Sequence, residues 1–338
     1  MKHPLTVFSI TALLLFAAIG CNRPSASDTH STPDRPTVAV SVAPTAWLVQ
    51  QVAGDAVDIV TVVGPGDNPH TYQPTDAEVT RIMRADLFLR IGAPVENQVW
   101  FEAIESSGRM EIVDLRQGIT LREMERHVDG PSVGAGHAHD CTHEHGHEHG
   151  GHSCAVHGKD PHIWLSPPLL KHQARTASEA LKTLLPKRKE PWDQAFAALE
   201  AKLDALHAEL KRQLTPLEGK AFFVFHPAWG YFADTYGLRQ IAIEIEGKEP
   251  TDRELTMLQE KARAEGVKVI FVQPQIDSQS VRAVASTVGA RVETIDPLAA
   301  DLPEALRHAA AALVKSYAPE GRKSETNPKN RNPQGTNR

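Results

Sequence analysis

Histidine is concentrated in one stretch of this 338-residue chain. Residues 137–157 read HAHDCTHEHGHEHGGHSCAVH, in which eight histidines and two cysteines stand among small and polar residues. Neutral imidazole and thiolate are ligands of Zn²⁺ and related ions, so the stretch predicts metal binding. Ordering it around one ion would cost about 1–2 kcal/mol of backbone entropy per residue, which favours several weak, exchangeable sites over one tight site. Its histidines are His137, His139, His143, His145, His147, His149, His152 and His157.

Four other candidate ligands stand in loops or where predicted strands end. They are His70 in VVGPGDNPHTYQPT, His162 in KDPHIWLSPP, His226 in FFVFHPAWGYF and Asp296 in VETIDPLAAD. Ligands of parallel α/β sheets bind at the carboxyl ends of the strands. Three imidazoles and one carboxylate there could form a closed zinc site. Each has an ordinary alternative, a loop histidine or, for Asp296, a turn or helix cap.

The elements that must position these residues alternate between strand and helix. Runs typical of strands cover 37–44, 56–63, 86–93 and 110–118, and later 220–227, 239–245, 267–274 and 290–297. Helical segments cover 45–54, 76–85 and 96–108, and later 228–237, 251–266, 277–289 and 301–318. This alternation predicts an α/β fold of two lobes, each a roughly four-stranded parallel sheet flanked by helices.

A single long helix is predicted between the two lobes. Its apolar residues recur at spacings of three and four, and it would span roughly 35 Å at about 1.5 Å per residue. Such a stiff connector should allow the lobes little relative motion. The apolar stripe consists of Phe196, Leu199, Leu203, Leu206, Leu210 and Leu214. The predicted boundaries are 37–186 for the first lobe, 187–216 for the helix, 217–318 for the second lobe and 319–338 for a disordered polar tail.

The N-terminus predicts export. Residues 1–20 fit a signal peptide whose apolar run is short for a membrane span of about 20 residues. The run ends in Ala18-Ile19-Gly20-Cys21, which resembles a lipobox without its usual Leu. Cys21 would then carry a lipid anchor, and 21–36 would be a flexible tether. The alternative is a plain signal peptide cut nearby. Either case predicts a periplasmic or otherwise extracytoplasmic protein. If Cys21 is lipidated, the protein is also anchored to a membrane.

The two remaining cysteines and the net charge give less information about the function than the candidate metal ligands do. Cys141 and Cys154 could pair as a disulfide in an oxidising compartment or act as soft metal ligands, and the sequence leaves both open. The net charge of −6, with no basic cluster outside the C-terminal tail, argues against a nucleic-acid partner.

Five motifs carry a family resemblance. In this order, NPHTYQPT, DPHIWLSP, FHPAWGYFADTYGL, IEGKEPTDREL and IDPLA resemble the cluster A-I solute-binding proteins, the zinc- and manganese-binding lipoproteins that feed metal ABC importers. The resemblance covers residues 37 to 318. It implies two lobes joined by one long helix, a monomer that delivers its metal to an ABC permease, and a metal in the cleft. The implied ligands are His70, His162, His226 and Asp296.

The resemblance also bears on the metal and on the histidine-rich stretch. Manganese-specialised members commonly carry Glu where this chain has His226, and a nitrogen-rich site favours Zn²⁺ as cargo over Mn²⁺. Manganese or iron remains the alternative. One departure is Ser166, where the family often has Asp. Zinc-specific members commonly carry a histidine-rich loop between the first two ligands, as here. We interpret it as a capture or sensing arm; the alternative is a solvated, dispensable linker.

Two other functions compete with metal delivery. A zinc hydrolase would keep three protein ligands and one open position, and the chain contains no HExxH motif. A surface adhesin is the second rival. Four protein ligands would sequester the ion without activating it, so we expect no enzyme activity. Release should need the transporter to distort the lobes, and acidification near the imidazole pKa of about 6.5 should weaken binding.

Overall fold

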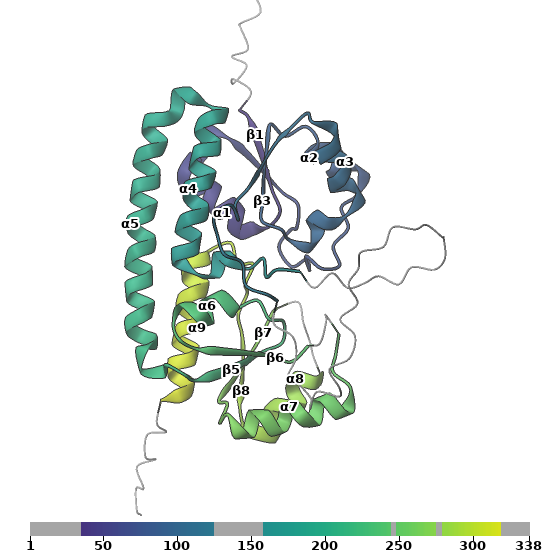
Figure 1. The fold of residues 1–338 in the computed structure, drawn as a ribbon, viewed down its shortest axis with the longest axis vertical. Coiled ribbons are helices and arrows are strands. Elements are labelled where there is room, and N and C mark those ends of the chain that lie inside the picture. Colours follow the sequence, from purple (N-terminus) through teal and green to yellow (C-terminus); the bar gives the residue numbers. More distant parts are fainter. Residues whose placement is uncertain (1–34, 125–157, 245–247, 275–278, 319–338) are drawn as a thin grey trace, which may run out of the picture. The chain divides into compact units, whose positions relative to one another are not determined.

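Two parallel four-stranded sheets form the framework of the protein. The computed structural model describes residues 35–124, 158–244, 248–274 and 279–318. The first sheet has the order β2-β1-β3-β4 and the second β6-β5-β7-β8, with every pairing parallel (Figure 1). The predicted fold class and all eight predicted strands are confirmed, although each strand is only four residues long. They are β1 Thr37–Val40, β2 Asp58–Thr61, β3 Leu87–Arg90, β4 Glu111–Asp114, β5 Ala221–Val224, β6 Arg239–Ala242, β7 Val269–Val272 and β8 Arg291–Thr294.

Both sheets have the same topology, and this creates their binding edges. In each, the chain starts in an inner strand, adds one neighbour on one side and then crosses to the other side. The connections after β1 and β3 therefore diverge, as do those after β5 and β7. Such switch points leave a crevice at the carboxyl ends of the strands, which is where open α/β sheets bind ligands.

The helices predicted on either side of the strands are present. The first lobe contains α1 Ala43–Ala53, α2 Asp76–Ile82 and α3 Val99–Ser107; the second contains α6 Gly230–Thr235, α7 Asp252–Ala264, α8 Gln279–Val288 and α9 Leu302–Tyr317. Capping boxes begin α2 and α7. Thr75 and Glu78 exchange side-chain and backbone hydrogen bonds at the first, and Thr251 and Glu254 do so at the second. These boxes satisfy amide groups that a helix start leaves unpaired.

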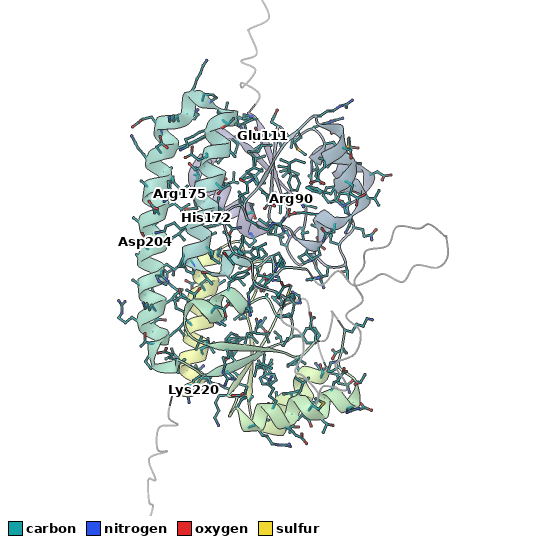
Figure 2. The ribbon with its side chains drawn as sticks, in the orientation of Figure 1. Arg90, Glu111, His172, Arg175, Asp204 and Lys220 are labelled. Atoms are coloured by element: carbon teal, nitrogen blue, oxygen red, sulfur yellow. The ribbon has the colours of Figure 1, made fainter. Side chains whose placement is uncertain are left out.

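The long helix is present as α5, Lys189–Leu214; the five leucines of its apolar stripe are buried and Phe196 is half-buried. It packs against α1 of the first lobe, α9 of the second lobe and α4, and so contacts helices of both lobes (Figure 1). On its solvent side, Lys171 and Arg175 of α4 reach Asp204 and Glu200 at 2.6 and 2.8 Å. Figure 2 shows Arg175 on α4 and Asp204 on α5.

One helix was not predicted. α4, Pro167–Leu184, begins with two prolines after Ser166, buries one face and packs along α5. Proline in the first turn is a helix-start signal, because its missing amide would be unpaired there anyway. The spacing of Leu170, Ala174, Ala177 and Leu181 also has helical periodicity. The single long helix α5 still joins the two lobes, and α4 packs along it as a second helix.

Side chains of the second sheet alternate between two cores. Phe222, Val224 and Phe271 belong to a core that continues through α5 and α9 into the first lobe. Phe223 and Ile270 belong to a smaller core with α7 and α8. Successive residues of a strand point to opposite faces, which explains this division. No helix in the described ranges is long and apolar enough to cross a membrane.

Candidate metal centre

Three of the predicted ligands converge. His70 lies in the loop after β2, His226 follows β5, and His162 lies just before a short 3-10 turn, Ile163–Leu165. The Nε2 atoms of His70 and His226 are 3.2 Å apart. The ring centroids of His162 and His226 are 5.2 Å apart, in an edge-to-face arrangement. Two nitrogens bound to one tetrahedral zinc at about 2.0–2.1 Å would be about 3.3 Å apart, which is close to the observed His70–His226 spacing.

Buried carboxylates stand behind two of these rings. The Nδ1 atom of His162 lies 2.8 Å from Asp160 Oδ1, and the Nδ1 atom of His226 lies 2.5 Å from Glu244 Oε1. Both carboxylate side chains are buried, at 1% and 9% exposure. A neutral imidazole donates its Nδ1 proton to such a partner, so the unprotonated Nε2 is left for a metal. These contacts therefore select the tautomer that a ligand histidine needs.

A small pocket lies at the switch points of both sheets. Val42 and Ala93 line it after β1 and β3, and Gln273 lines it after β7, together with the three histidines. Its free volume is about 20 Å³. One water-sized guest needs about 10–15 Å³, so the pocket has room for a single ion.

The environment keeps two of the imidazoles neutral. Desolvation, followed by the charges that His226 and His162 would carry, lowers the pKa of His70 to about 3. Burial also lowers the pKa of His162, against the opposing pull of Asp160. Charged imidazoles this close would repel one another. A divalent cation could replace the missing protons, because neutral imidazole is the form that coordinates a metal.

The fourth predicted ligand, Asp296, is at the same edge but is not shown in contact with the imidazoles. It follows β8, and its Oδ1 accepts a hydrogen bond of 2.9 Å from the Leu298 amide. Its neighbours Pro297 and Leu298 line the pocket, and burial raises the pKa of its carboxyl. Within the described ranges, no three or more His, Cys, Asp or Glu side chains are grouped so that they could hold a metal as they stand. The structure therefore brings the histidines together, and the four-ligand set stays a prediction.

The sequence analysis missed Asp160 and Glu244. Both had a signal: Asp160 stands two residues before His162 in KDPHIW, and Glu244 follows β6, beside the strand that leads to His226. An acidic residue at the buried carboxyl end of a strand is costly unless it has a partner. The partner here is a ligand histidine, which single-sequence reasoning could have considered.

The other predicted site residues lie outside the described ranges. They are the eight histidines of the histidine-rich stretch, Cys141 and Cys154 within it, and Cys21 at the predicted lipobox. The chain on either side of 125–157 is described. Glu123 and Lys159 form an antiparallel bridge, and the Met124 amide reaches the Gly158 carbonyl at 3.4 Å. The two ends of the segment are thus held side by side, close to His162.

Fold and pocket together define an α/β ligand-binding protein with two lobes and a metal-sized, imidazole-lined cleft. The chain belongs to the family of the zinc-uptake complex component A, periplasmic (ZnuA), whose model matches residues 38–316. The resemblance found in the motifs is thereby confirmed. Members of this family are extracytoplasmic solute-binding proteins of zinc uptake.

Individual relatives agree with this assignment. The high-affinity zinc uptake system protein ZnuA of Bacillus subtilis is 28% identical over 297 residues, covering 86% of this chain and 88% of the relative. A crystal structure of ZnuA matches with a TM-score of 0.71 at 33% identity, covering 84% of this chain and 99% of the other. A zinc-bound ZnuA deletion mutant matches at 0.72 and 32%, covering 85% and 100%. Compared with the zinc-binding lipoprotein AdcA of Streptococcus pneumoniae, this chain spans only 55% of the relative's length.

Proposed function

We propose that this protein captures Zn²⁺ in the pocket between its two sheets and delivers it to an ABC importer. The observation that carries the proposal is the pair of facing Nε2 atoms of His70 and His226, 3.2 Å apart in a pocket sized for one ion. Family membership supports the same cargo, since the matching family model is that of a zinc-uptake component. The ion is cargo, so tight but reversible binding is what the site must provide.

The proposed ligands are His70, His162, His226 and Asp296. The facing imidazoles of His70 and His226 would coordinate the zinc ion directly from opposite sides of the pocket. His162 would coordinate it from a third direction, and Asp296 would complete the tetrahedron from the edge of the second sheet. Three nitrogen donors and one oxygen donor favour Zn²⁺ over Mn²⁺, which prefers oxygen. A complete set of four protein ligands leaves no position for an activated water. The protein is therefore proposed to be a binding protein and not a hydrolase.

The export features fit this role. A lipid on Cys21, joined to the fold by the polar residues 21–36, would keep the binding protein at the membrane that holds its permease. The histidine-rich stretch would supply weak accessory sites for zinc. Because the Glu123–Lys159 bridge holds the ends of the stretch near His162, ions released from it would have a short path to the pocket.

Equilibrium competition against a zinc chelator tests the proposal. A strong chelator holds free zinc too low for weak accessory sites, so the titration reports tight sites only. We expect one tight site per chain, weakened at least about 100-fold by His226→Ala, beyond the upper range for loss of a residue behind a ligand. His308→Ala removes an exposed imidazole of α9 and is the matched control, which should bind as the unmodified chain does. Equal affinity of His226→Ala and the control would refute the pocket as the cargo site.

A further inference from the structure

The residues behind the imidazoles raise a question that the proposed function does not answer. Asp160 and Glu244 do not point their carboxylates into the pocket; they contact Nδ1 of His162 and His226. Both side chains are more than nine-tenths buried. A buried carboxylate is costly to desolvate, so its position behind a ligand ring calls for a specific role.

Hydrogen bonds of both its side chain and its backbone fix Asp160 in place. Its Oδ1 accepts from both the backbone amide and Nδ1 of His162, at 2.9 and 2.8 Å. Its own amide donates to the Arg122 carbonyl at 3.0 Å, and its carbonyl accepts from the Tyr231 hydroxyl at 2.9 Å. The carboxylate, the backbone and the ring are therefore fixed as one unit.

The carboxylate of Asp160 interacts mainly with His162. Its Oδ2 is buried and makes no hydrogen bond with any described residue, and the Nη1 of Arg122 remains 4.0 Å away and is likewise unsatisfied. A close bidentate ion pair would have drawn the charge toward Arg122. Instead, the nearest strong partner of the carboxylate is Nδ1 of His162, on the face opposite a metal.

The segment around His162 is docked on the second lobe. Trp164 Nε1 donates to the Pro297 carbonyl at 2.8 Å, and Ser166 Oγ lies 2.8 Å from Thr235 Oγ1. Tyr231 and Thr235 both belong to α6, and Pro297 follows Asp296. His162, which precedes α5 in sequence, is thus positioned by the same lobe that carries His226 and Glu244.

We propose that Asp160 and Glu244 are positioning residues for zinc, each holding one imidazole with Nε2 toward the ion and raising its basicity. This inference rests on the proposed function and deepens it. The site keeps nitrogen donors in contact with the ion, which suits zinc, while two negative charges lie one ring farther out. The carboxylates thereby compensate the charge of a dication without themselves occupying coordination positions.

The test uses the full chain and Zn²⁺ alone in the same chelator competition. Asp160→Ala and Glu244→Ala should each weaken binding by about 10–100-fold. Asp160→Asn and Glu244→Gln keep a hydrogen-bond acceptor and should restore part of the loss; they also decide the matter if an alanine variant does not fold. The control is Asp204→Ala, which removes a carboxylate from the α4–α5 ion pair.

A second readout separates positioning from a general structural effect. Long-range ¹H–¹⁵N spectra of the metal-free protein report which imidazole nitrogen is protonated. Rings 162 and 226 should show Nδ1–H in the unmodified chain and in the control, and should lose that preference in the alanine variants. Unchanged zinc affinity or an unchanged tautomer in both alanine variants would overturn the inference. If His226→Ala keeps the tight site, the proposed function itself has failed; if only the carboxylate variants bind normally, the inference alone has failed.

Discussion

The Nε2 atoms of His70 and His226 lie 3.2 Å apart, although 156 residues separate them in the chain. One belongs to the loop after β2 and the other follows β5, so each sheet contributes one side of the contact. Without a metal, one ring must donate a proton to the other. With a metal, both lone pairs can face the ion at nearly the same separation.

Zinc should stabilise the folded protein through this contact. At a free zinc concentration of about 100 times the dissociation constant, binding adds about 2.7 kcal/mol to the free energy of unfolding. For a folded region of this size that corresponds to a Tm increase of roughly 5–10 °C. Differential scanning fluorimetry with buffered zinc measures the shift. His226→Ala should show less than half of it, and a full shift in that variant would place the stabilising ion elsewhere.

Acid should weaken zinc binding less than three ordinary imidazoles would predict. An imidazole with a pKa of about 6.5 loses about tenfold in metal affinity by pH 5.5, so three would lose roughly a thousandfold. The pKa of His70 is lowered to about 3 and that of His162 is also lowered. A lowered pKa keeps the imidazole neutral to lower pH, so protons begin to compete with zinc for its nitrogen only at a lower pH. Titrations at pH 7.5 and 5.5, corrected for the chelator's own protonation, should show a loss clearly smaller than a thousandfold. A full thousandfold loss would contradict these pKa shifts, because it would mean that zinc binding weakens near the ordinary imidazole pKa of about 6.5.

Gly230 should be needed for the arrangement of Arg122 beside Asp160. A Cβ atom at this position would lie 1.3 Å from Arg122 Nη1, so Gly230→Ala must displace the guanidinium. Because the displaced group is the far end of a flexible side chain, we expect a loss of less than about 1 kcal/mol in the free energy of unfolding. Chemical denaturation measures it. In an Arg122→Ala background the same glycine substitution should cost almost nothing, and an equal cost there would show that the clash is not with Arg122.

The buried face of α5 should stabilise the whole described fold. Leu203 is 2% exposed and belongs to the core that reaches both sheets. Leu203→Ala should lower the free energy of unfolding by about 2–5 kcal/mol. The neighbouring exposed Lys202→Ala should stay within about 0.5 kcal/mol. Denaturation followed by fluorescence should also remain a single transition in Leu203→Ala, since the core is shared. Two separate transitions would mean that the lobes unfold independently.

Most of the fold could be predicted from the sequence because its signals are local. Apolar β-rich runs alternate with helical periodicity, and turn residues separate them. Strand lengths were overestimated, since residues such as Val42 and Ile91 continue the buried apolar pattern beyond the four paired residues. α4 was missed because half of its buried apolar residues are alanines, namely Ala174, Ala177 and Ala180, and polar residues stand between them. Small residues give a weak periodic signal, although they allow α4 and α5 to pack closely.

The candidate site could be predicted only in part. Strand ends and motif order indicated His70, His162 and His226, and the structure brings their rings together. The carboxylates at 160 and 244 depend on contacts across the fold, which periodicity cannot report. Asp296 was inferred by the same reasoning as the histidines, and its carboxylate bonds to the Leu298 amide.

The most direct test of the central claim removes the histidine-rich stretch. The Glu123–Lys159 bridge holds the flanking chain together, so residues 137–157 can be deleted from the full chain without stretching the remainder. Chelator competition on this variant should still show one tight zinc site, and adding His226→Ala to the same deletion should abolish it. If tight binding disappears with the stretch alone, the cargo site is not the pocket between the two sheets.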